Sequence, residues 1–116
     1  MPRDPLTYIW DALHAAKQIS AFIDGRTWEE YIADTMLSSA VERQFEIIGE
    51  ALNNLSRENK DEAEKIPDLG KIVAFRNVLI HGYANIDSSL VWSFATERLD
   101  SLIELLNSLI REGEKN

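Results

Sequence analysis

The residues best suited to chemistry lie together in one short segment, residues 75–83. Arg76, Asn77, His81 and Tyr83 bring a guanidinium, a carboxamide, an imidazole and a phenol within eight residues. A guanidinium stays charged when buried and binds phosphate oxygens through paired hydrogen bonds. An imidazole can accept and donate a proton near neutral pH. Together these groups could cleave RNA without a metal ion. His81 would move the proton of the 2′-hydroxyl or of the leaving oxygen, and Arg76 would stabilise charge on the phosphate oxygens.

The spacing of these residues limits how they can meet. Each residue of a helix turns by about 100°, so Arg76 and His81 lie about 140° apart and would not converge on one phosphate. Asn77 and His81, four residues apart, share a face. Two arrangements would solve the problem. Either the helix unwinds near Gly82 and redirects His81, or two chains pack these helices together in a two-fold dimer with a shared cleft.

The same residues also have structural interpretations. Arg76 could form an ion pair with a glutamate, His81 could interact with the carboxyl end of its helix, and Tyr83 could be a core aromatic. A short Arg-x4-His spacing is common by chance. Taken alone, the segment therefore leaves open catalysis, phosphate binding without catalysis, and a purely structural role in a helical dimer.

Helical patterns surround this segment. Asp4 and Pro5 are typical of a helix start, and apolar residues then recur every three or four positions until Gly25. A short helix follows, opened by a Thr27–Glu30 capping box, and then a long helix over about 35–55. Residues 56–65 form a polar exposed connection with room for some helix. A further helix runs from Pro67–Asp68 to Gly82, and a last helix is capped by Asp87 or Ser88. No segment alternates as a strand does. The sequence predicts one all-α domain over residues 1–116, an antiparallel bundle of four main helices plus a short one.

Composition excludes several classes of protein. The 116 residues include no cysteine, so a disulfide framework, a thiolate nucleophile and a zinc finger are excluded. His14 and His81 are far apart, and no spacing suggests a metal site. No apolar run approaches the ~20 residues of a membrane span, and the start lacks the apolar stretch of a signal peptide. A cytoplasmic protein without a metal or a cofactor of its own is expected.

The overall charge is unfavourable for RNA binding, because 12 basic and 20 acidic residues give a net charge of −8. The acids are unevenly spread, however: residues 69–86 contain none, whereas they include Lys71 and Arg76. Two such segments facing each other would form a small basic cleft in an acidic shell. We therefore expect few phosphate contacts and a shallow dependence of RNA binding on salt.

A second polar group lies on the long predicted helix. Arg43, Glu46 and Glu50 lie opposite the apolar stripe of that helix. They fit a solvated face with charge pairs three and four residues apart, or a polar wall near the dimer cleft. Gly49, which costs roughly 1 kcal/mol in a helix relative to alanine, indicates close approach of another helix.

The pattern Arg76-Asn77-x3-His81-x-Tyr83 resembles the R-x4-H-x-Y motif of HepT-like toxins, which belong to the HEPN superfamily of helical ribonucleases. The segment Ala40-Val41-Glu42-Arg43-Gln44-Phe45-Glu46-Ile47-Ile48-Gly49-Glu50-Ala51 is similar to the second signature of that family. The order and spacing of the helices also fit, so the resemblance covers essentially the whole chain, and none of the motif positions departs from the pattern.

This resemblance implies a HEPN-like fold and a specific activity. HepT-like proteins are toxins of type II toxin–antitoxin modules, and they act as metal-independent endoribonucleases. They form homodimers in which both motifs line one cleft. Arg76 and His81 would then be catalytic, with Asn77 supporting the site. The partner would be a minimal nucleotidyltransferase antitoxin of the HepT/MntA type, which uses ATP to transfer AMP to Tyr83. The alternative is a non-catalytic helical module that binds a nucleotide or a nucleotidyltransferase.

Overall fold

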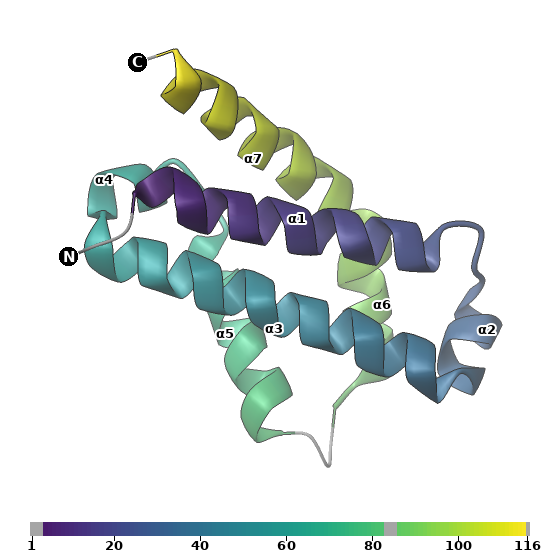
Figure 1. Ribbon diagram of the computed structural model, residues 1–116. Helices are drawn as coiled ribbons and strands as arrows, with labels where there is room; N and C mark the ends of the chain where they lie inside the picture. Colours follow the sequence, from purple (N-terminus) through teal and green to yellow (C-terminus); the bar gives the residue numbers. More distant parts are fainter. Residues whose placement is uncertain (1–3, 83–85, 116) are drawn as a thin grey trace.

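The fold is built from seven helices in the part of the chain that the computed structural model describes, residues 4–82 and 86–115 (Figure 1). No strand occurs there, which confirms the predicted all-α class. None of the described helices has the length and apolarity needed to cross a membrane. The helices are α1 (Pro5–Ile23), α2 (Trp28–Ala33), α3 (Thr35–Glu58), α4 (Lys60–Ala63), α5 (Leu69–His81), α6 (Ser88–Glu97) and α7 (Leu99–Glu114).

Most helix starts lie where the sequence places a capping side chain. The Asp4 carboxylate accepts from the Leu6 N–H at 2.9 Å, and Asp87 caps α6. Thr27 and Glu30 form the predicted capping box, with reciprocal hydrogen bonds of 3.1 and 3.0 Å. These caps satisfy N–H groups that have no partner within the helix. The local signals therefore fix where these elements begin.

Two elements differ from the prediction. The long helix continues past its predicted end to Glu58, and the polar connection after it contains α4, in agreement with the room for some helix expected there. The expected single last helix is divided at Arg98 into α6 and α7, which run in different directions (Figure 1). Just before this break, the Thr96 hydroxyl donates to the Trp92 carbonyl at 2.8 Å. Back-bonding of this kind bends helices, and the bend lets α7 pack against α1.

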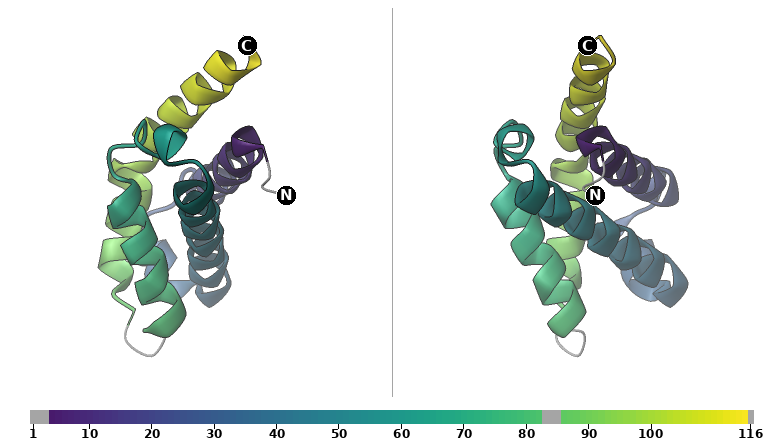
Figure 2. Two further views of the ribbon diagram at one scale, coloured as in Figure 1. Left: turned by 90° about the vertical axis from the view of Figure 1, so that its left-hand side faces the viewer. Right: turned by 60° about the vertical axis from the view of Figure 1, so that its left-hand side comes forward.

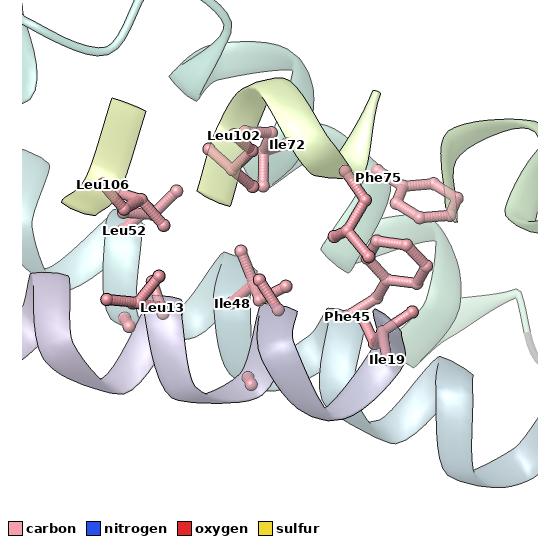
Figure 3. Close-up of a cluster of buried hydrophobic side chains, with 14 of the residues drawn as sticks. Leu13, Ile19, Phe45, Ile48, Leu52, Ile72, Phe75, Leu102 and Leu106 are labelled. Carbon is pink, nitrogen blue, oxygen red and sulfur yellow. The ribbon is translucent and has the colours of Figure 1, made fainter. Parts of the chain in front are cut away.

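The helices pack in two groups. Helices α1 and α3 run antiparallel and side by side (Figure 1), while α5 and α6 lie next to each other on one side of that pair (Figure 2). Leucine, isoleucine and phenylalanine side chains from α1, α3, α5 and α7 meet between them (Figure 3). The carboxyl-terminal end of α5 extends past α3 (Figure 1). The core therefore anchors α5 through Ile72, Phe75 and Leu79, and the last residue of the helix, His81, lies at the surface.

Three phenylalanine rings attach α5 and α6 to α3. The Phe45 ring of α3 lies edge-on to the rings of Phe75 and Phe94, with centroids 5.3 Å away in each case. The Phe75 and Phe94 rings stack at 5.4 Å. Offset-stacked and edge-on pairs are the favoured arrangements of aromatic side chains. Because Phe75 precedes Arg76, this cluster fixes the part of α5 that carries the polar motif.

Candidate active site

Helix α5 carries three of the four residues of the candidate site. It remains helical through His81, and the Gly82 N–H closes it by donating to the Val78 carbonyl at 2.7 Å. The arrangement in which the helix unwinds and redirects His81 is therefore wrong. The main-chain positions of Arg76 and His81 lie about 140° apart around a regular helix, so their convergence on one phosphate depends on the reach of the arginine side chain or on a second chain.

Arg76 is held on two sides. Its aliphatic stem packs against the main chain of α3 at Gly49, which confirms the close approach expected at that glycine. At the other end, the Arg76 Nη1 donates to the Asn77 Oδ1 at 3.0 Å. This bond turns the guanidinium toward the side of α5 that Asn77 shares with His81.

The charge of Arg76 has no acidic partner in the described part of the chain. None of the ion pairs found there includes Arg76, so within the described residues Arg76 forms no ion pair with a glutamate. The side chain is half-buried, and its Nε is buried without a hydrogen-bond partner among the described residues. A partly buried, unneutralised cation is costly unless it meets an anion, so this site is suited to phosphate.

His81 and Asn77 are both exposed near the end of α5. Exposure lets the imidazole exchange protons with a substrate or with water. The fourth residue of the motif, Tyr83, lies outside the described residues.

The polar residues of α3 separate into two places. Arg43 and Glu46 form an ion pair of 3.6 Å, three residues apart. Glu50 instead lines a pocket of about 290 Å³ between α1 and α3, together with Asp11 and His14. The charge pairing expected for a solvated face is thus present, and the role of these residues as a cleft wall stays a prediction. Among the described residues, no cluster of histidine and acidic side chains could hold a metal ion.

Glu42, next to this group, should make stability depend on pH. Burial, and secondly the Glu46 carboxylate, raise the pKa of Glu42 above its ordinary 4.5. The folded chain then holds this proton at pH values where the unfolded chain has lost it. Stability from this group is therefore full below the ordinary pKa and falls as the pH rises through the raised one. We expect Glu42→Gln to stabilise the protein at pH 7, by less than about 1 kcal/mol because the carboxyl is largely solvated.

Urea denaturation at pH 4 and pH 7 measures this effect. Glu104→Gln on the exposed side of α7 removes the same charge without the burial, and it controls for the change in net charge. Equal gains at pH 7 for both variants would contradict the assignment to Glu42.

A groove between α5 and α6 was not predicted as part of the site. It has a volume of about 380 Å³, and its walls include Lys71, Phe75, Phe94 and Arg98. Val78 and Leu90 at its edges are 50% and 51% exposed, which is high for large apolar side chains. The sequence signal was the breadth of the apolar stripes, because more apolar positions are present than one chain needs to fill its core.

Comparison with known proteins adds to this geometry. A model of the family described as "Ribonuclease HepT-like" matches residues 12–109. The chain belongs to this family. The HepT-like match spans α1 to α7 and includes the described site residues on α5, which confirms the resemblance found in the sequence. The family is described as a ribonuclease family, so RNA cleavage is the activity that the geometry of the site has to explain.

Individual HepT-like relatives agree with this assignment. "Putative RNase MJ1380" of Methanocaldococcus jannaschii is 36% identical over 97 residues, covering 82% of this chain and 86% of the relative. "Probable ribonuclease HepT" of Thermococcus cleftensis is 31% identical over 102 residues, covering 88% and 92%. "Putative RNase MJ0127" of Methanocaldococcus jannaschii is 29% identical over 115 residues, covering 98% and 94%. No solved structure matches the chain significantly.

Proposed function

We propose that this HepT-like protein is the toxin of a type II toxin–antitoxin pair and cleaves RNA without a metal ion, at a site shared by two copies of the chain. The observation that carries the proposal is Arg76. It is half-buried, it has no acidic partner among the described residues, and its hydrogen bond to Asn77 directs it toward the face of His81. Family membership supports ribonuclease activity.

A second copy of the chain accounts for two features at once. It would supply a second Arg76 and His81 from across the interface, which one regular helix cannot do by itself. The second copy would also cover the groove between α5 and α6, whose edges carry the exposed Val78 and Leu90. Val78 lies three residues before His81 and so borders it on the helix surface. Covering this apolar edge would place the partner copy beside the imidazole.

The chemistry follows from the groups that would line such a cleft. One His81 accepts the proton of a ribose 2′-hydroxyl, and the 2′-oxygen attacks the adjacent phosphorus. The bond to the 5′-oxygen breaks, and the other His81 donates a proton to that leaving oxygen. The products are a 2′,3′-cyclic phosphate and a 5′-hydroxyl. The two Arg76 guanidiniums stabilise the negative charge that develops on the phosphate oxygens.

An RNA assay in EDTA tests this function. Purified protein should cut a short RNA in excess EDTA, and it should leave intact the same strand with 2′-deoxyribose throughout, because that strand lacks the nucleophile. Cleavage of both strands, or cleavage that requires an added divalent ion, would contradict the mechanism. Tight nucleotide binding with no turnover would instead favour the non-catalytic binding module.

A nucleotidyltransferase antitoxin would neutralise this toxin by modifying Tyr83. The phenol oxygen would attack the α-phosphorus of ATP, forming a Tyr83–AMP ester and releasing pyrophosphate. Tyr83 follows His81 by two residues, so the added phosphate would bring negative charge close to the imidazole. Such a charge would repel the RNA backbone and fill the cleft.

Mass spectrometry tests the antitoxin step. Co-expression with a nucleotidyltransferase that neutralises the toxin is expected to add AMP to the wild-type chain and not to Tyr83→Phe. Tyr8→Phe, which changes a tyrosine of α1, is the matched control, and this variant should still receive AMP on Tyr83. A neutralised pair in which the wild-type chain carries no adduct would mean inhibition by binding alone.

A further inference from the structure

Gly49 lies buried in the middle of α3, where α5 crosses it. A β-carbon added at Gly49 would lie 2.1 Å from the Cβ of Arg76 and 2.6 Å from its Cγ. Both distances are far below van der Waals contact. The Arg76 Cβ is fixed to the α5 main chain and cannot swing away as the tip of a flexible side chain could. Any residue larger than glycine must therefore move the Arg76 stem or the helix that carries it.

The other described helical glycines lack this relation to the candidate site. Gly70 has nothing within 4 Å of an added Cβ, whereas an added Cβ at Gly113 would meet the flexible end of Leu6, at 2.5 Å from its Cδ2. The requirement at Gly49 is thus particular to the arginine that faces it. A glycine in a helix interior costs roughly 1 kcal/mol relative to alanine, and this contact gives a reason for that cost.

The contact also restricts the charged end of the side chain. With its Cβ and Cγ held against α3, Arg76 has few rotamers left, and its Nε is buried in the position it takes. The Nη1 then reaches the Asn77 Oδ1 at 3.0 Å. We infer that Gly49 is a positioning residue for RNA cleavage: it sets the place of the Arg76 guanidinium without touching the substrate. This inference rests on the proposed ribonuclease function.

The first test needs no variant and no activity. The Arg76 Nε–H should exchange with solvent at least about ten-fold more slowly than the Nε–H of Arg43, whose side chain is 62% exposed. Nuclear magnetic resonance of 15N-labelled arginine side chains measures both rates in the wild-type chain. Equal rates would mean that the stem is not held, and the inference would fail. This measurement tests whether the Arg76 stem is held even if RNA cleavage is absent or a Gly49 variant does not fold.

The second test measures cleavage kinetics. Gly49→Ala is expected to lower kcat by roughly 10- to 100-fold with little change in the KM for RNA, because a small displacement of a catalytic group is costly. Gly70→Ala and Gly113→Ala are the matched controls and should keep the wild-type kcat. The Gly113 variant also brings a new Cβ close to a side chain, the flexible end of Leu6, away from α5. If the wild-type chain cleaves RNA and Gly49→Ala is equally active, the inference is overturned and the ribonuclease function stands.

A double-variant cycle separates positioning from general damage to the fold. If Gly49 acts through the Arg76 side chain, Gly49→Ala should have no further effect on the residual activity of Arg76→Gly, which removes both the guanidinium and the Cβ that faces position 49. If it merely loosens the packing of α3 and α5, the two losses should multiply. Multiplication of the losses would overturn the inference.

Discussion

Replacing His81 with alanine is expected to lower the rate of RNA cleavage by roughly 10²- to 10⁴-fold, the range typical of lost acid–base catalysis. His81 is exposed at the end of α5, and in the proposed dimer both copies of the imidazole are lost together. The folded state should be nearly unaffected, because exposed substitutions of this kind usually change stability by less than about 0.5 kcal/mol. Single-turnover cleavage of a labelled RNA measures the rate, and circular dichroism melting measures the stability.

Arg76→Ala should reduce cleavage by roughly 10²- to 10³-fold, through loss of charge stabilisation. The variant keeps the Cβ that packs against Gly49, so the contact between α3 and α5 is largely retained. Asn77→Ala should have a smaller effect, since it removes only the acceptor that orients Nη1. A catalytic guanidinium predicts that Arg76→Ala lowers kcat and that Asn77→Ala has the weaker effect. If Arg76 only binds RNA, Arg76→Ala should raise KM and leave kcat unchanged.

His14→Ala is the matched control for these variants. It removes the other histidine, which is exposed on α1 and lines the pocket between α1 and α3. Its cleavage rate should equal that of the wild-type chain. If His81→Ala and Arg76→Ala also cleave at the wild-type rate, the residues on α5 are not the site, whatever nuclease activity the preparation contains.

The sequence predicted what local interactions determine. Helix starts at Asp4, Thr27 and Asp87 could be found because each capping side chain bonds to a main-chain N–H within three residues. The polar motif could be found because its members lie on one helix. Such features depend on neighbours in the sequence, and the surrounding fold does not change them.

Features that depend on distant residues were harder to predict. The position of Arg98 between α6 and α7 follows from the packing of α7 on α1, and the apolar periodicity alone continued through it. The glycine at 49 indicated that some helix comes close, but it could not indicate that Arg76 is the residue opposite. The contact between these two residues joins the two segments that carry the sequence resemblance, and only the folded chain reveals it.

Phe45→Ala is expected to destabilise the fold by about 3–5 kcal/mol, the usual cost of removing a buried phenylalanine. The Phe45 ring is 1% exposed and touches the rings of Phe75 and Phe94. Its removal leaves a cavity where α3, α5 and α6 meet, and it also removes two aromatic contacts worth about 0.5–1.5 kcal/mol each beyond burial. Urea denaturation followed by circular dichroism measures the change.

The size of this loss depends on where the ring lies, so a second phenylalanine provides the control. Phe22 near the end of α1 is only half-buried, and Phe22→Ala should cost clearly less. Phe45→Leu fills part of the cavity, so its loss of unfolding free energy should lie between those of Phe22→Ala and Phe45→Ala. If Phe45→Ala costs no more than Phe22→Ala, the three-ring cluster does not hold α5 on α3. If the cluster does hold α5, partial loosening by Phe45→Leu should lower RNA cleavage while the chain remains folded, because Arg76 follows Phe75 directly on the same helix.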